Sequence, residues 1–345
     1  MKNLKKIIFI GILLLIGSKS EAQQLPIYSQ YMFNDYVINP GVAGTLDYIP
    51  LKMTYRNQWT GFNGAPKTVT FTGHSPLSDH IGMGTMLYSD VTGPISNSGL
   101  QLSYNFRFPV SGKYCEWDKR KFLSLSLSTK LNQFTFDNTN EMNYSQHAPD
   151  GLGVIDPVLP EGMESSYNVY YSLAAYFYSE RLYAGISALD IFSTSSDLNI
   201  LSNQDDGFTN NIVGQYNFMV GYYYPIDQQL NWAVEPSLLL KKTSYSDMQY
   251  HLNAKLIYQD FIWLGMSYRQ FDSFVILLGA DYGQYFFGYS YDTSVSNINN
   301  YNSGSHEIII GYNFNISRKR DNTRLKKRFE DRRNLLNPFK EYKRL

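Results

Sequence analysis

Apolar and polar side chains alternate along most of the chain, from about residue 49 to residue 316. Leucines alternate with serines over residues 123–128, and apolar side chains alternate with polar ones over residues 102–108. Because successive side chains of a strand point to opposite faces, each run makes one apolar face and one small or polar face. Many runs reach about ten residues, the length that a tilted strand needs to cross a bilayer.

This pattern predicts an all-β protein, a transmembrane antiparallel β-barrel of about 14 strands, an even number as in bacterial single-chain barrels. The predicted strands are 49–59, 67–75, 80–90, 98–109, 120–133, 166–179, 181–191, 214–225, 230–242, 248–259, 261–270, 273–282, 284–292 and 305–316. A secreted β-sandwich is the alternative, since it also alternates. The high aromatic content, with 30 Tyr, 21 Phe and 4 Trp, favours a barrel with aromatic girdles.

The predicted connections alternate in length, which sets the orientation of the barrel. Tight turns are expected at 179–181, 259–260 and 282–284, and long polar connections at 134–165, 192–213 and 293–304. With both chain ends in the periplasm, the tight turns lie on the periplasmic side and the long connections outside, as is typical of such barrels.

The first 22 residues have the three-part pattern of a secretory signal peptide. Three lysines lie in residues 1–6, an apolar run covers 7–17, and Ser20-Glu21-Ala22 places small residues before a cut ahead of Gln23. A retained membrane anchor is the alternative, but a spanning helix needs about 20 apolar residues. We expect the mature protein to be an integral protein of the outer membrane.

Residues 23–48 precede the first strand and carry Pro26, Pro40, Gly41 and Gly44, so we expect an irregular segment. It is too aromatic to stay in water, which predicts that it plugs the barrel lumen or its periplasmic mouth. The alternative is a periplasmic extension that packs on another protein. The stretches 261–264 and 274–278 are apolar on both faces, which indicates wall strands whose inner side is also packed. The domain organisation is then signal peptide 1–22, plug-like segment 23–48, barrel 49–317 and tail 318–345.

No motif indicates catalysis, a cofactor or a metal site. The five histidines lack ligand spacing, His74-Ser75 has no nucleophile elbow that would support a lipid hydrolase, and the acidic residues near 150–156 and 205–206 lack the spacing of a calcium loop. The single cysteine, Cys115, excludes an internal disulfide. We therefore expect a protein that is not an enzyme and has no cofactor.

A long ordered motif follows the predicted cleavage point. It runs Gln24-Leu25-Pro26-Ile27-Tyr28-Ser29-Gln30-Tyr31-Met32-Phe33-Asn34, then Ile38-Asn39-Pro40-Gly41-Val42-Ala43-Gly44, Arg56-Asn57-Gln58-Trp59-Thr60-Gly61-Phe62 and Gly64-Ala65-Pro66. It resembles the opening of the PorP/SprF family of type IX secretion proteins, with Gly41 and Val42 in place of an Ala-Tyr pair. The resemblance covers about residues 24–95. The motif residues that are candidates for partner binding are Tyr31, Asn34, Asn39, Pro40, Gly44, Arg56, Gln58, Trp59, Gly61 and Pro66.

The resemblance implies an outer-membrane component of a type IX secretion and gliding apparatus. Such a component would dock or anchor a secreted cargo at the cell surface, through the C-terminal domain of an adhesin-like protein, and would contact periplasmic secretion components and outer-membrane lipid. A diffusion channel for a small solute is the alternative function.

The chain ends in a strongly basic tail. Residues 318–345 contain 12 basic and 4 acidic residues, a net charge of +8. Such a density of charge attracts acidic surfaces, and after an even number of strands the tail emerges in the periplasm, on the side where we expect the mature N-terminus. We predict that it docks to a periplasmic partner rather than to nucleic acid, the alternative being a solvated tail that only touches anionic lipid. The candidate residues are Arg318, Lys319, Arg320, Arg324, Lys326, Lys327, Arg328, Arg332 and Arg333.

Overall fold

The computed structural model of the 345-residue chain describes residues 26–110, 121–137, 162–194, 213–227, 232–243, 246–259, 261–295 and 302–315. The predicted signal peptide, the basic tail with its nine docking candidates, and most of the long connections lie outside these residues. They remain predictions.

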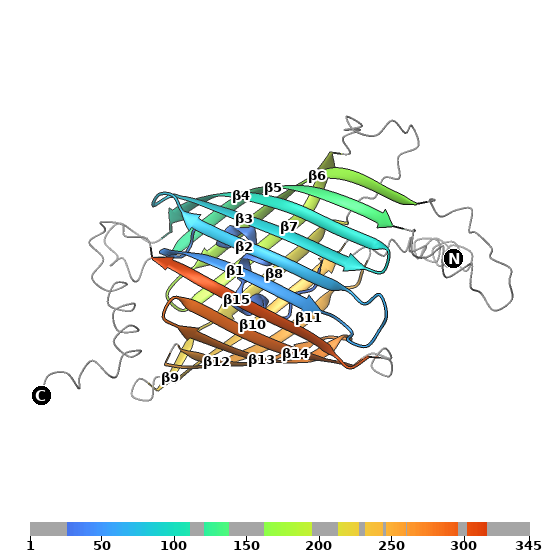
Figure 1. Cartoon of the computed structure of the whole chain (residues 1–345). Helices are drawn as coiled ribbons and strands as arrows, with labels where there is room; N and C mark the ends of the chain where they lie inside the picture. Colours follow the sequence, from blue (N-terminus) through green and yellow to red (C-terminus); the bar gives the residue numbers. More distant parts are fainter. Residues whose placement is uncertain are drawn as a thin grey trace, which may run out of the picture.

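The described chain is built almost entirely of strands (Figure 1). They are β1 (Tyr48–Asn57), β2 (Lys67–Pro76), β3 (Ile81–Thr92), β4 (Ile95–Pro109), β5 (Phe122–Asp137), β6 (Met163–Tyr178), β7 (Leu182–Thr194), β8 (Gln215–Tyr222), β9 (Tyr224–Asp227), β10 (Trp232–Thr243), β11 (Gln249–Tyr258), β12 (Ile262–Arg269), β13 (Ser273–Tyr282), β14 (Tyr285–Ser294) and β15 (Ser305–Asn315).

The strands close into one antiparallel barrel. Each strand pairs with its neighbour in the chain, and the first strand, β1, pairs with the last, β15. Strands β8 and β9 are two parts of one wall strand, interrupted at Tyr223, because both pair with β10. The barrel therefore has 14 wall strands, which confirms the predicted fold class.

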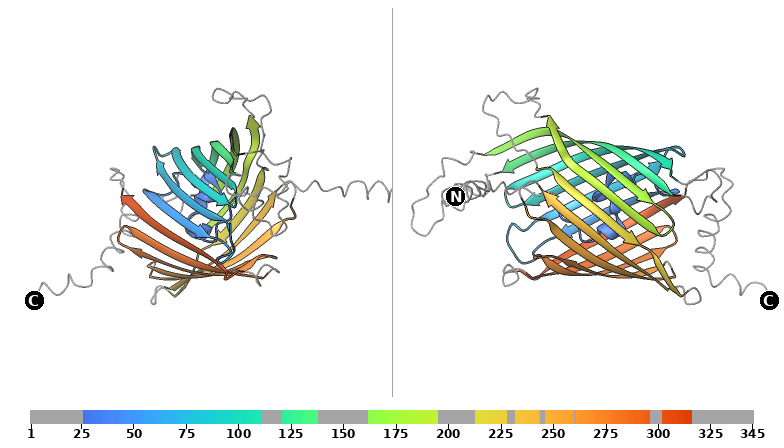
Figure 2. Two further views of the ribbon diagram at one scale, coloured as in Figure 1. Left: turned by 45° about the vertical axis from the view of Figure 1, so that its right-hand side comes forward. Right: turned by 180° about the vertical axis from the view of Figure 1, so that it is seen from behind.

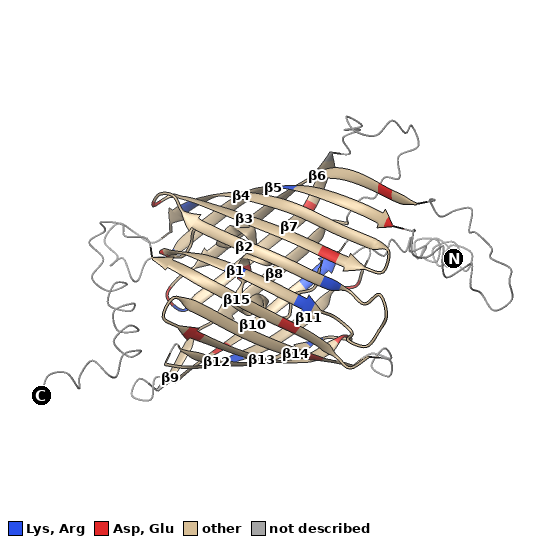
Figure 3. Ribbon diagram, in the orientation of Figure 1, with Lys and Arg blue, Asp and Glu red and all other residues tan. Residues whose placement is uncertain are grey.

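Alternation sorts the side chains between the two faces of the wall. In β5, Leu125 and Leu127 are 44% and 55% exposed on the outside, whereas Ser124, Ser126 and Ser128 are buried on the inside. Charged residues are sparse along the strands, and most of the wall is uncharged (Figure 3). The outer face is thus suited to hydrocarbon and the inner face to polar contacts.

The structure extends several strands beyond the predicted bounds. Strand β4 begins at Ile95 rather than at residue 98, β5 ends at Asp137, and β6 begins at Met163. A tight turn at Gly93, which has φ +55°, joins β3 to β4. Residues 96–98 are polar on both faces, so this part of the strand gives no alternation signal.

The two ends of the barrel differ, and we call them the loop end and the turn end. The loop end is where β1 ends and β2 begins, and it carries the long connections from Asp137 to Met163 and from Thr194 to Gln215. The turn end is where β1 begins and β15 ends. It carries the short turn between β6 and β7, but also the longer connection from Pro109 to Phe122.

In the described part of the chain, the helical elements are three single 3-10 turns, η1 (Tyr31–Phe33), η2 (Asp35–Val37) and η3 (Pro40–Val42). They precede β1 and lie within the ring of strands (Figures 1 and 2). Among the described residues, no helix has the length and apolar character that crossing a membrane requires.

Candidate functional site

The stretch from Pro26 to Asp47, here called the inner segment, packs against the inward face of the wall. Nearly every side chain from Tyr28 to Ala43 is buried. Its partners come from strands all around the barrel: Tyr36 hydrogen-bonds Ser103 of β4 at 2.8 Å, and Ser187 of β7 donates to the carbonyl of Ile38 at 2.8 Å. The inner segment is therefore held by the lumen wall.

The inner segment runs along the lumen from one end of the barrel to the other. Ser29 bonds residues at the loop end of β14 and β15, Lys52 in the middle of β1 donates to the carbonyl of Phe33, and Arg107 near the turn end of β4 donates to the carbonyl of Gly44. The chain then enters β1 at the turn end. The described part of the inner segment therefore begins toward the loop end, whereas β15 ends at Asn315 at the turn end. The mature N-terminus and the C-terminal tail lie outside the described residues, so their shared side stays a prediction.

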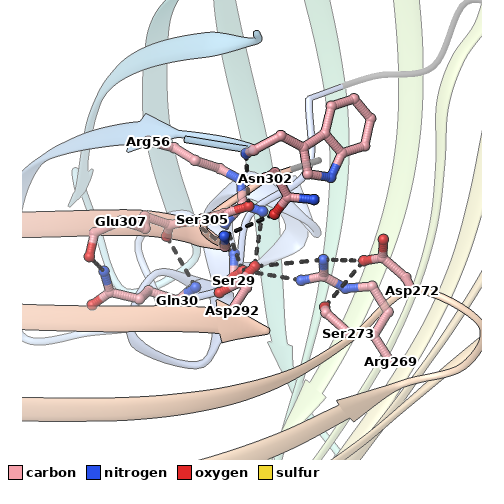
Figure 4. A network of polar contacts seen from close by, with 12 residues as sticks. Ser29, Gln30, Arg56, Arg269, Asp272, Ser273, Asp292, Asn302, Ser305 and Glu307 are labelled. Atoms are coloured by element: carbon pink, nitrogen blue, oxygen red, sulfur yellow. Dashed lines mark hydrogen bonds and ion pairs between the residues drawn. The ribbon is translucent and has the colours of Figure 1, made fainter. Parts of the chain in front are cut away.

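A buried charged cluster holds the loop-end part of the inner segment (Figure 4). Arg56 of β1 pairs with Asp292 of β14 at 2.8 Å and with Glu307 of β15 at 3.1 Å. Arg269 of β12 lies 3.8 Å from Asp292 and also pairs with Asp272 at 2.6 Å. The side chains of both arginines and of Asp292 and Glu307 are at most 2% exposed. Each of these buried charges therefore depends on the others for stabilisation.

Ser29 and Gln30 complete this cluster from the inner segment. Both arginines donate to the Ser29 hydroxyl, at 2.7 Å and 3.1 Å, and that hydroxyl donates to Asp292 at 2.5 Å. The Glu307 carboxylate accepts the backbone N–H groups of Ser29 and Gln30, at 2.8 Å and 3.0 Å. Charge-assisted bonds of this kind are stronger than neutral ones, so Ser29 and Gln30 hold the loop-end part of the inner segment in place.

The wall is apolar where the inner segment is apolar. The Phe33 ring lies 5.9 Å from Trp263 and 5.5 Å from Phe286, between ring centroids. Val275 and Leu277 of β13 point inward and are buried in the same core. This contact explains why the sequence of β12 and β13 is apolar on both faces: one face meets lipid and the other meets the inner segment.

Asn39 and the residues after it shape the turn-end part of the inner segment. The Asn39 side chain accepts the N–H of Gly41 at 2.8 Å, which caps η3, and donates to the carbonyls of Ala175 and Ile186 at 3.2 Å. Pro40 sits at the first position of η3, where a missing N–H costs nothing.

Gly44 adopts φ +76°, and a Cβ there would lie 2.5 Å from the Cα of Gly82. Only glycine adopts this conformation at so close an approach to the wall.

Tyr31 and Asn34 are held in the lumen by side chains of the wall. Asn253 donates to the Tyr31 hydroxyl at 2.5 Å, and Asn34 donates to Thr72 at 2.9 Å.

The remaining motif residues form an ordered connection at the loop end, here called the outer platform (residues 58–66). The N–H of Gln58 bonds the carbonyl of Pro66 at 2.9 Å, and the N–H of Trp59 bonds the Ser305 hydroxyl at 3.1 Å. Thr60 exchanges backbone bonds with residues 303 and 304, while Gly64 accepts the N–H of Gly93. Gly61 has φ +95°. The platform is thus braced by both neighbouring connections, and it exposes Phe62, which is 52% accessible.

The structure places the motif residues in two connected parts, the inner segment packed on the wall and the outer platform. Arg56 connects them, because it bonds the inner segment and belongs to β1, the strand that leads into the platform. Sequence reasoning missed Arg269, Asp292 and Glu307. A signal was available for Glu307: it directly precedes three isoleucines, at an inward position of a predicted membrane strand, where an unpaired carboxylate is costly. Within the described residues, no group of His, Cys, Asp and Glu could hold a metal ion.

A closed barrel of 14 strands with an apolar outer face and a packed polar interior defines an integral outer-membrane β-barrel. The sequence pattern of the type IX secretion system membrane protein PorP/SprF family matches residues 20–312. The chain belongs to this family, as the motif resemblance indicated, and is therefore a membrane component of a type IX secretion system.

Solved structures with a similar outline share little sequence with this chain. Omp33, an outer membrane protein of Acinetobacter baumannii, aligns with 9% identity and a TM-score of 0.41 over 78% of this chain and 98% of its own. The Ralstonia pickettii toluene transporter TbuX aligns with 8% identity and a TM-score of 0.43 over 84% and 94%. A Pseudomonas aeruginosa FadL homologue aligns with 11% identity and a TM-score of 0.42 over 85% and 95%. No curated protein sequence matches.

Proposed function

We propose that this secretion-system component docks a secreted cargo protein at the outer face of the membrane, and that it neither catalyses a reaction nor conducts a solute. The observation that carries the proposal is the inner segment, whose buried contacts run the length of the lumen. A barrel whose lumen holds residues 26–47 of its own chain is better suited to present its loop end as a binding surface than to conduct a solute.

The outer platform supports the docking role. Its backbone is braced on both sides, so its exposed side chains are held in place before a partner arrives, which lowers the entropy cost of binding. Phe62 and the half-exposed Trp59 provide flat apolar area of the kind that protein interfaces use. The cargo would be a large secreted protein that presents its C-terminal domain, as the family resemblance implies.

The test for docking compares two equally exposed apolar residues at opposite ends of the barrel. Phe62 at the loop end is 52% exposed, and Leu77 at the turn end is 54% exposed. Phe62→Ala should reduce both the cross-linked recovery of a large secreted protein and its display on cells, while Leu77→Ala should leave both unchanged. Equal recovery from both variants would contradict a docking role for the platform.

The test for conduction uses the purified full-length barrel in planar bilayers. The filled lumen predicts no steady ion conductance. Deletion of residues 26–44 should create one, provided that the shortened protein still shows the heat-modifiable gel shift of a closed barrel. Steady conductance of the intact protein would favour the solute-channel alternative.

We further propose that the basic tail, residues 318–345, docks the barrel to a periplasmic component of the secretion system. Its net charge of +8 supports this, and the last described residue, Asn315, ends β15 at the turn end. Truncation after Ser317 should leave insertion intact but abolish cross-linking to periplasmic partners. Cross-linking that persists and keeps the same salt dependence would argue that the tail only touches solvent and lipid.

A further inference from the structure

The loop-end part of the inner segment lies close to the outer mouth of the barrel. Tyr28 hydrogen-bonds Thr70 of β2 at 2.9 Å. Pro26 and Tyr28 line a small cavity with Lys130, Asp190 and Gln215, and Gln215 is the first residue of β8 at the loop end. The start of the described chain is therefore on the side of the long connections, far along the lumen from Tyr48.

The exposure of this part changes sharply at Tyr28. Pro26 and Ile27 are half-buried, whereas Tyr28, Ser29 and Gln30 are at most 8% exposed. Ser29 and Gln30 are fixed by their hydrogen bonds to the charged cluster, which restrains the position of the neighbouring Pro26 and Ile27. Because the residues that follow them are buried among loop-end partners, the exposed parts of these two apolar residues lie toward the loop end.

We propose that the inner segment is threaded through the lumen with its start toward the loop end, so that Pro26 and Ile27 form part of the extracellular surface. There they serve as an apolar contact point for the docked cargo. The role toward cargo rests on the proposed docking function, whereas the threading stands on the contacts of the segment. The partner chemistry is an apolar side chain of a secreted protein, which would pack against the exposed parts of Pro26 and Ile27.

Cysteine labelling on intact cells tests the threading. Single-cysteine variants are made in a Cys115→Ser background whose barrel keeps its heat-modifiable shift: Ile27→Cys, with Phe271→Cys as the outer control and Glu180→Cys as the turn-end control. Phe271 is 81% exposed in the loop-end turn after β12, and Glu180 is exposed in the turn between β6 and β7. A membrane-impermeant maleimide should label Ile27→Cys and Phe271→Cys on intact cells, and Glu180→Cys only after the outer membrane is permeabilised.

Labelling of Ile27→Cys only after permeabilisation, or not at all, would overturn the threading. Exchange of the two controls would show that the barrel is inserted the other way and would overturn it too. The role toward cargo has a separate readout: loss of cargo recovery in Ile27→Asp, with surface labelling of the Cys variant intact, supports the contact. Unchanged recovery in Ile27→Asp overturns the contact but leaves both the threading and the platform in place.

Discussion

Replacing Arg56 by Met should destabilise the closed barrel by about 3 kcal/mol, the lower end of the cost of removing one partner of a buried ion pair. Methionine keeps an unbranched side chain but removes the charge that neutralises Asp292 and Glu307, at 2.8 Å and 3.1 Å. The loss stays at the lower end because Glu307 keeps two backbone N–H donors and Asp292 keeps the Ser29 hydroxyl.

The measurement is urea unfolding of the barrel in lipid vesicles, followed by the heat-modifiable gel shift. Arg181→Met is the matched control, because Arg181 is exposed at the turn end and its loss should cost within about 0.5 kcal/mol. Adding Glu307→Gln to Arg56→Met removes an uncompensated charge. The double variant should therefore be less destabilised than the sum of the two single variants, by about 1 kcal/mol or more.

A second readout separates the cluster from general stability. Arg56→Met removes a bond to Ser29, so the inner segment should become cleavable by protease at Tyr31 and Phe33 under conditions where the strands stay intact. Equal costs for Arg56→Met and Arg181→Met, or strict additivity of the double variant, would show that the cluster does not hold the segment as described.

Two further outcomes are expected. Leu125→Arg places a charge on the lipid face and should cost about 2–4 kcal/mol near the midplane, whereas the same change at Leu77, outside the strands, should cost little in the same urea assay. Gly82→Ala puts a Cβ 2.3 Å from the carbonyl oxygen of Ala43 and should cost about 1–3 kcal/mol, while Gly214→Ala, whose nearest contact is 3.5 Å, should be neutral in urea unfolding.

Much of the barrel was predictable because the alternation of apolar and polar side chains is visible within the sequence of each single strand. Alternation over 123–128 assigns Leu125 to lipid and Ser126 to the interior without knowledge of any other strand. The prediction failed at strand ends such as residues 96–98, where both faces of β4 are polar and the wall extends beyond the apolar band. There the ladder of backbone bonds continues, but no side-chain contrast marks it.

The charged cluster was not predictable, because its members are far apart in sequence. Arg56 and Asp292 are separated by 236 residues and Arg56 and Glu307 by 251, and only barrel closure brings them together. The motif around Arg56 was visible in the sequence, but its partners carry no motif of their own. The direction of the inner segment was missed for the same reason: it follows from which wall residues receive Ser29 and Gln30.

The pairing of Arg56 with Glu307 has a consequence for assembly. The two residues are directly opposite each other in the ladder between β1 and β15, the first and last strands to leave the ribosome. The binding site for Ser29 and Gln30 does not exist until these strands meet, and it forms only in the register that places Arg56 opposite Glu307. Seating of the inner segment is then a late event in biogenesis, and it selects the correct register at the one seam of the barrel that no hairpin turn specifies. By bonding Arg56 of β1 and Glu307 of β15, Ser29 and Gln30 thus stabilise the closed barrel against separation of its first and last strands.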